Sequence, residues 1–108
     1  MSEPTMRHLA PALHLAYLIA EQDPGLPAAM ISVSYTHPST VEVSLHGDPG
    51  DMEPWRVALG IAPAEVRLDT HKGSSWLTAS TTVRGVRVEL TFHLPTPVAP
   101  RNTEGGAR

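Results

Sequence analysis

The pattern of apolar and polar residues changes its period once along the chain, from three or four residues to two. Over residues 6–22 the apolar side chains recur at helical spacing. One stripe of this helix is formed by Met6, Leu9, Leu13, Tyr17 and Ala20. Thr5 is a candidate N-cap, and Asp23-Pro24-Gly25 ends the helix. Pro11 either kinks the helix or stands at the first position of its regular part.

From Met30 onward, alternation predicts strands, interrupted by one short helix that begins near Asp51 and ends at Gly60. The five expected strands cover residues 31–35, 40–46, 66–69, 76–83 and 86–94. Residues 37–39 form the first turn. We therefore expect an α+β fold in the order α-β-β-α-β-β-β, with the helices on one face of a five-stranded antiparallel sheet in two layers.

The first helix is apolar beyond its main stripe. Leu15, Leu18 and Ile19 lie off that stripe and leave few polar positions on the helix. A helix that is apolar all round is usually covered on two sides, and the sheet provides only one cover. We expect a second subunit to provide the other, so Leu15, Leu18 and Ile19 are the predicted interface of a homodimer.

The length of 108 residues suits a single domain, which we place at residues 1–94. Residues 95–108 are rich in proline and glycine and predict a disordered tail. The absence of cysteine excludes disulfides, thiolate metal sites and cysteine nucleophiles. No basic leader opens the chain, and its longest apolar run, residues 15–20, is too short to cross a membrane. We expect a soluble cytoplasmic protein with no membrane partner.

Two groups of residues could supply metal ligands, but neither has the spacing of a known site. The histidines with outward parity near strand ends are His46, His71 and His93. They would converge only if their strands were neighbours, and we expect them to be solvated or hydrogen-bonded in turns. The acidic cluster is Asp48, Asp51 and Glu53. Because it precedes a helix, N-capping and the helix dipole account for it, with Asp51 as the N-cap. We predict no metal and no cofactor.

Nothing in the hydroxyl-rich stretch of residues 74–82 resembles the surroundings of a catalytic nucleophile, and we predict no catalytic residue. Four cations lie around the last three strands: Arg67, Lys72, Arg84 and Arg87. Carboxylates are interleaved with them, and no aromatic side chain is expected on the same polar face, so cross-strand ion pairs explain them better than nucleic acid. The net charge of −3 agrees with this interpretation. Trp55 is expected in the core, whereas Trp76 fits either the core or an exposed position.

The chain contains a series of short motifs in a definite order: Leu26-Pro27, the first strand pair, Leu45-His46-Gly47-Asp48 and Trp55-Arg56-Val57-Ala58-Leu59-Gly60-Ile61-Ala62-Pro63. In these motifs the chain resembles uncharacterised small actinobacterial proteins that are often encoded in integrative or plasmid-like mobile elements. The resemblance spans residues 26–94 and departs from the family pattern at Met52 and Pro54. It implies the context of a mobile-element accessory protein and implies no activity.

The function that we predict from these observations is that of a non-enzymatic accessory protein that acts through protein–protein contacts, as a homodimer. The first alternative is a nucleic-acid-associated regulator that uses Arg67, Arg84 and Arg87. The second alternative is a small-molecule-binding domain with a pocket between the helices and the sheet.

Overall fold

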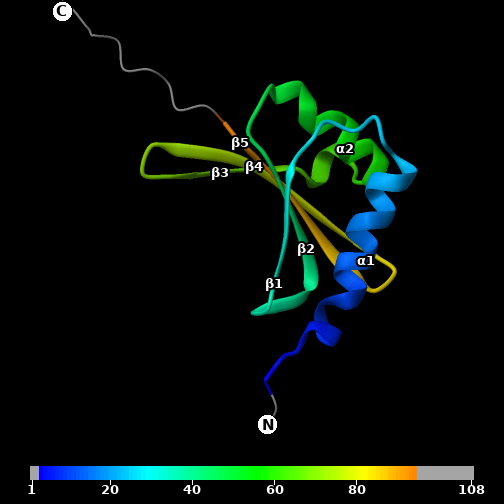
Figure 1. Cartoon of the computed structure of the whole chain (residues 1–108). Helices are drawn as coiled ribbons and strands as arrows, with labels where there is room; N and C mark the ends of the chain where they lie inside the picture. The colour runs from blue at the N-terminus through cyan, green and yellow to red at the C-terminus, as the bar shows by residue number, and fades with distance from the viewer. Residues whose placement is uncertain (1–2, 95–108) are drawn as a thin grey trace, which may run out of the picture.

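The computed structural model describes residues 3–94 (Figure 1). The elements are α1 (Met6–Gln22), β1 (Met30–Ser34), β2 (His37–Leu45), α2 (Met52–Leu59), β3 (Arg67–His71), β4 (Ser74–Val83) and β5 (Val86–His93). Two short 3-10 turns, η1 (Pro49–Asp51) and η2 (Pro63–Glu65), flank α2. The predicted order α-β-β-α-β-β-β and the α+β class are confirmed. The predicted tail, residues 95–108, lies outside the described residues.

The five strands form one sheet in the order β1-β2-β5-β4-β3. Neighbouring strands are antiparallel except β2 and β5, which are parallel, with Val41 opposite Val88 and Leu45 opposite Phe92. The prediction of a fully antiparallel sheet is therefore wrong at this pair. After β2, the chain crosses through α2 to the far edge, and two hairpins then return it until β5 lies beside β2. The sequence pattern of a strand does not predict such a crossover, because apolar and polar residues alternate in the same way in parallel and antiparallel strands.

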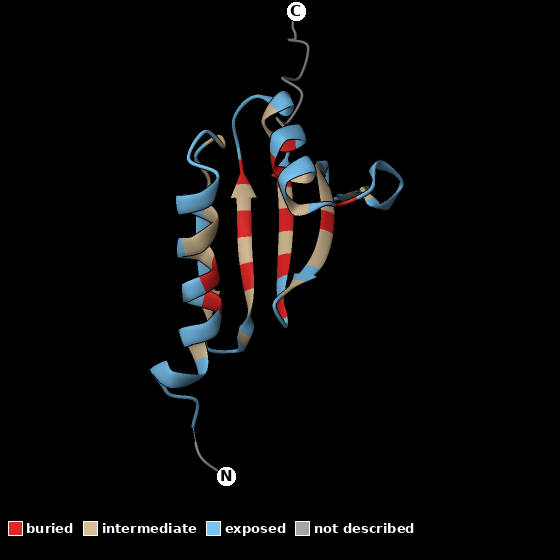
Figure 2. Ribbon diagram, turned by 90° about the vertical axis from the view of Figure 1, so that its right-hand side faces the viewer, coloured by how far each residue is buried: buried red, intermediate tan, exposed pale blue. Residues whose placement is uncertain are grey.

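The core lies between the two helices and one face of the sheet (Figure 2). The fully buried side chains come from the central strands: Val41, Val43, Leu45, Val88, Leu90 and Phe92. From α2, Trp55 is only 3% exposed, and its Nε1 donates a hydrogen bond of 2.8 Å to the carbonyl oxygen of Pro27. This bond joins α2 to the segment between α1 and β1, and the predicted core position of Trp55 is confirmed.

Helix α1 presents a different face to the sheet from the one that the sequence indicated. Ala12 and Leu15 are buried, with 0% and 4% exposure, whereas Leu13 and Tyr17 are 43% and 59% exposed. The core side of α1 is built around Ala12, whose short side chain lets the helix axis approach β2 closely. The larger residues of the predicted stripe are displaced to the flank. The helix continues through Pro11 and does not begin there.

The ends of α1 and of the first strand pair are set by local hydrogen bonds. Thr5 is the N-cap, and its backbone N–H donates to Nδ1 of His8 over 2.9 Å. The turn between β1 and β2 lies at residues 35–36 and not at residues 37–39. The N–H of Thr36 donates to Oγ of Ser34, and the two hydroxyls are 2.7 Å apart. These side-chain bonds close the turn without proline.

A matched pair of leucine substitutions tests the position of the core. Leu90→Ala removes a fully buried side chain of β5 and should lower the free energy of unfolding by about 2–5 kcal/mol. Leu68→Ala changes an edge-strand side chain that is 62% exposed, and should cost less than about 0.5 kcal/mol. Urea unfolding of both variants measures the difference. Equal costs would contradict the burial of β5 between β2 and β4.

Candidate functional site

The acidic residues before α2 serve the start of the helix. Oδ1 of Asp48 accepts the backbone N–H of Gly50 over 2.8 Å and so caps η1. Asp51 occupies the N-cap position of α2, as predicted, but its side chain makes no capping hydrogen bond. Glu53 is paired with Arg56. Within residues 3–94, no cluster of three or more histidine, aspartate or glutamate side chains could hold a metal ion.

Two of the three outward histidines lie together. The rings of His46 and His93 are stacked, with centroids 4.5 Å apart and planes 2° from parallel. The parallel pairing of β2 with β5 causes this, because Leu45 lies opposite Phe92 and each histidine is the next residue along its strand. His71 lies on β3, which is two strands away from β5. Sequence reasoning identified these histidines by parity, but only the strand order shows which of them meet.

The three arginines of the nucleic-acid hypothesis do not share a surface. Arg67 on β3 and Arg87 on β5 line the open face of the sheet, which is the face opposite α1 and α2. Arg84 occupies the β4–β5 turn with φ 53° and lines a hollow between α1 and α2. Nε of Arg87 donates to Oε2 of Glu89 over 2.8 Å, an ion pair within one strand where a cross-strand pair was predicted. In the part of the chain that the structure describes, Arg67 makes no ion pair and no side-chain hydrogen bond.

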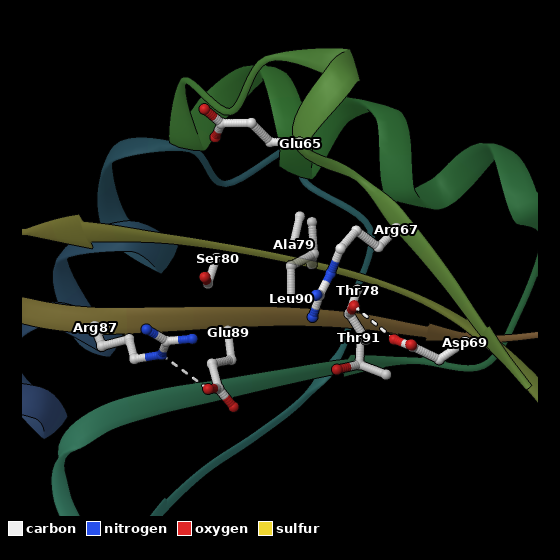
Figure 3. Close-up of a pocket in the computed structure, with 10 residues that line it drawn as sticks. All are labelled: Glu65, Arg67, Asp69, Thr78, Ala79, Ser80, Arg87, Glu89, Leu90 and Thr91. Atoms are coloured by element: carbon white, nitrogen blue, oxygen red, sulfur yellow. Dashed lines mark hydrogen bonds and ion pairs between the residues drawn. The ribbon is translucent and has the colours of Figure 1, made fainter. Parts of the chain in front are cut away.

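The open face contains a shallow groove of about 270 Å³ (Figure 3). Its polar lining consists of Glu65, Arg67, Asp69, Thr78, Ser80, Arg87, Glu89 and Thr91. The side chain of Ala79, which also borders the groove, is buried in the core below it. Oγ1 of Thr78 donates to Oδ2 of Asp69 over 3.2 Å. The groove therefore combines hydroxyl groups, three carboxylates and two guanidinium groups, and only one of these guanidinium groups is paired with a carboxylate.

A row of aromatic rings lies beside this groove. Trp76 alternates along β4 with Leu77, which packs against the core, so Trp76 is on the open face. It lies opposite His93 on one side and opposite Asp69 on the other. The row therefore runs Asp69, Trp76, His93, His46 across the sheet. The expectation that this polar face carries no aromatic side chain is wrong, although the alternation of residues 76–80 contained the signal.

The other prominent surface is an exposed apolar edge. Six of the eight large apolar residues that are exposed in residues 3–94 belong to α1, β1 or the turn after β1: Met6, Leu13, Tyr17, Met30, Ile31 and Tyr35. The remaining two, Val57 and Leu68, lie on other elements. We call the group of six the α1–β1 edge. Ala20 of α1 and Ile31 of β1 line one hollow, so the helix stripe adjoins the strand.

The predicted interface residues lie elsewhere. Leu15 is buried against its own sheet, and Ile19 packs against the same core. Leu18 is half-buried and lines the hollow between α1 and α2 that Arg84 also borders. The helix does have apolar surface in excess of what the sheet covers, but Leu13 and Tyr17 carry it. Periodicity revealed two apolar stripes and could not decide which of them faces the sheet.

The two edges of the sheet differ in charge. Strand β1 has the sequence Met-Ile-Ser-Val-Ser and contains no charged residue. Strand β3, at the opposite edge, carries Arg67, Asp69 and His71. Charged side chains on an edge strand discourage pairing with another chain, and their absence leaves the backbone groups open to it. Strand β1 is therefore the edge suited to strand pairing.

Comparisons with protein-family models, with curated proteins and with solved structures find no significant match to this chain. The relation to actinobacterial mobile-element proteins stays a prediction from the sequence motifs. Neither helix within residues 3–94 is long and apolar enough to cross a membrane. The open face and the α1–β1 edge are therefore the two surfaces from which function can be inferred.

Outside both surfaces, one ion pair changes the pKa values of its members. Nε of Arg56 donates to Oε2 of Glu53 over 2.9 Å, and a second nitrogen donates to the carbonyl oxygen of Ile61 over 2.6 Å. The hydrogen bond to Arg56, helped by its charge, holds the pKa of Glu53 below its ordinary value of 4.5 and raises the pKa of Arg56. Arg56 thereby connects α2 to the chain that leads to β3.

The titration of Glu53 tests this pair. Because its pKa is lowered in the folded state, the stabilisation is present above pH 4.5 and is lost as the pH falls through the lowered pKa. An NMR titration of the Glu53 carboxyl carbon should give a midpoint below 4.5, and Arg56→Gln should return it to the ordinary value. Arg84→Gln, on the β4–β5 turn, is the control and should leave the midpoint unchanged. The same midpoint in wild type and Arg56→Gln would contradict the pairing.

Proposed function

We propose that this protein is a non-enzymatic accessory protein that acts through protein–protein contacts, and that the partner at its α1–β1 edge is a second copy of the same chain. The observation that carries the proposal is the concentration of exposed apolar side chains on this one edge, where Leu13 is 43% and Tyr17 is 59% exposed. A patch of this kind is typical of an interface. It replaces the surface predicted from Leu15, Leu18 and Ile19.

Strand β1 is compatible with pairing to its own copy. Antiparallel pairing of two β1 strands would satisfy the open N–H and C=O groups at the edge of both sheets. The five residues Met30–Ser34 set no like charges against each other in any antiparallel register, because none of them is charged. A two-fold axis at this edge gives an interface of identical patches, which is the commonest form of a homodimer.

Helix α1 adds charge complementarity to the same arrangement. A two-fold axis perpendicular to the sheet at β1 would place the two copies of α1 side by side and antiparallel. The N-terminal half of α1 carries Arg7, and its last turn carries Glu21, whose Oε2 accepts the hydroxyl of Tyr17 over 2.9 Å. In the antiparallel arrangement, Arg7 of each copy approaches Glu21 of the other. Opposite charges at the rim favour this orientation over a parallel one.

The geometry gives less support to catalysis and to the binding of duplex nucleic acid. Among the hydroxyls of β4, Thr78 donates to Asp69 and Ser75 bonds to the hydroxyl of Thr70. Within the described residues, no hydroxyl of β4 is hydrogen-bonded to a histidine that could act as its base. Binding of duplex nucleic acid through Arg67, Arg84 and Arg87 would need one basic surface. The three arginines are divided between the two faces of the sheet. The open-face groove is also rich in carboxylates, which repel the phosphate backbone of a duplex.

The oligomeric state tests the proposal. The wild-type chain should be a dimer by light scattering at micromolar concentration. Leu13→Glu places a charge on the apolar stripe and should raise the dimer dissociation constant at least about tenfold, since a desolvated charge costs more than 1.4 kcal/mol. The matched control is Val57→Glu, an exposed apolar residue of α2, which should leave the dimer intact. A wild-type monomer at 100 µM, about a hundred times a micromolar dissociation constant, would end the proposal.

A charge exchange tests the orientation of the two helices. Arg7→Glu alone and Glu21→Arg alone each set like charges against each other across the antiparallel pair, and each should weaken the dimer by about twofold to fivefold. The double variant Arg7→Glu/Glu21→Arg restores opposite charges and should recover the wild-type dissociation constant at low salt. Sedimentation equilibrium measures all three. Additive weakening in the double variant would contradict the antiparallel arrangement.

A further inference from the structure

The aromatic row on the open face is not part of the interface proposed at the α1–β1 edge. His46 and His93 stack face to face, and both residues are exposed. Trp76 is half-buried and directly opposite His93, so the Cβ atoms of the two residues are about 5 Å apart. Exposed aromatic rings in a row on an open sheet face form a surface on which a flat heteroaromatic ring can stack.

The next row along the strands carries a cation. Arg67 lies opposite Thr78, and Thr78 lies opposite Thr91. Thr78 is two residues beyond Trp76 on β4, so the two rows are about 7 Å apart along the strand direction. The guanidinium of Arg67 has no carboxylate partner among the described residues, and it lies over the groove beside Thr78 (Figure 3). A free guanidinium beside hydroxyl groups is suited to the bidentate binding of a phosphate.

We propose that the open face binds a nucleotide unit, with its base stacked on Trp76 and His93 and its phosphate on Arg67. The spacing of the two rows is comparable to the distance between the base and the 5′-phosphate of a nucleotide. Thr78 in the row of Arg67 and the second oxygen of Asp69 in the row of Trp76 offer hydrogen bonds to sugar hydroxyls. Asp69 already accepts from Thr78 through Oδ2, which holds the carboxylate in place on the groove wall.

The charges around the groove restrict the ligand further. Glu65, Asp69 and Glu89 line the same groove as Arg67, and Arg87 is already paired with Glu89. A single phosphate can bind at Arg67, whereas a triphosphate or a duplex backbone would meet the carboxylates. The unit that fits is therefore a nucleoside monophosphate. It can be a free nucleotide or one residue of a single strand, whose bases are open to stacking.

The two tryptophans allow a direct test by NMR of their indole N–H groups. Titration with adenosine 5′-monophosphate or with a single-stranded hexamer of adenylate should shift the Trp76 signal. The Trp55 signal should stay in place, because that indole is buried and donates to Pro27. Adenosine should bind at least about tenfold more weakly than the monophosphate, since it lacks the contact with Arg67. The Leu13→Glu variant should give the same shifts, so that failure of the dimer and failure of this site can be told apart.

Substitutions on the two faces of the sheet test which residues contact the nucleotide. Arg67→Gln should lower the affinity for the monophosphate to that of adenosine, whereas Arg84→Gln, on the helix side, should have no effect. Trp76→Ala should weaken binding tenfold or more, and Trp76→Phe, which keeps a ring, should retain most of it. Tighter binding of the hexamer that weakens steeply with salt supports a single strand as the source. Comparable or tighter binding of the monophosphate supports a free nucleotide.

The proposal is overturned by either of two results. One is a Trp76 signal that does not move with millimolar monophosphate or with the hexamer. The other is an affinity that is unchanged in Arg67→Gln, because the phosphate would then have no role at that residue. The pairing of β3, β4 and β5 is made by backbone groups, which Trp76→Phe and Arg67→Gln do not change, so we expect both variants to fold.

Discussion

The parallel pairing of β2 with β5 is the constraint on which the rest of this structure depends. It brings the two most buried strands together, with Val43 opposite Leu90 at the centre of the core. It requires the crossover through α2, because two adjacent parallel strands cannot be joined by a tight turn. It also leaves β1 and β3 as the two edges of the sheet and brings His46 against His93. Both candidate surfaces therefore follow from one strand pair.

Local periodicity was sufficient to predict the elements and their order, because each helix and strand is encoded by its own alternation. It was also sufficient, in principle, for Trp76, whose neighbours Leu77 and Thr78 have opposite surroundings. The sequence could not reveal the pairing of strands that are distant along the chain. For that reason the stacking of His46 on His93 could not be predicted, nor could the separation of Arg84 from the other two arginines.

In α1, the face that is buried is not the one that the spacing of the large apolar residues predicts. A helix that carries two apolar stripes can place either of them on a sheet, and the larger residues of the first stripe favoured Leu13 and Tyr17 for the core. The structure instead buries Ala12, because small side chains at the contact allow the helix to lie close to β2. The bulky residues then remain at the flank of the helix, beside β1. The buried face combines Ala12 with Leu15, and the spacing of the apolar residues does not show which of the two stripes meets the sheet.

The different composition of the two sheet edges separates the two proposed functions in space. The charges of β3 discourage pairing at that edge, and two of the charged residues, Arg67 and Asp69, also line the open-face groove. Strand β1 lacks charge and borders the apolar stripe of α1. Pairing at β1 about an axis perpendicular to the sheet would leave both open faces on the same side of the joined sheet. The grooves near β3 would then lie at its two outer ends, so that a dimer could hold two nucleotide units at once without either site covering the interface.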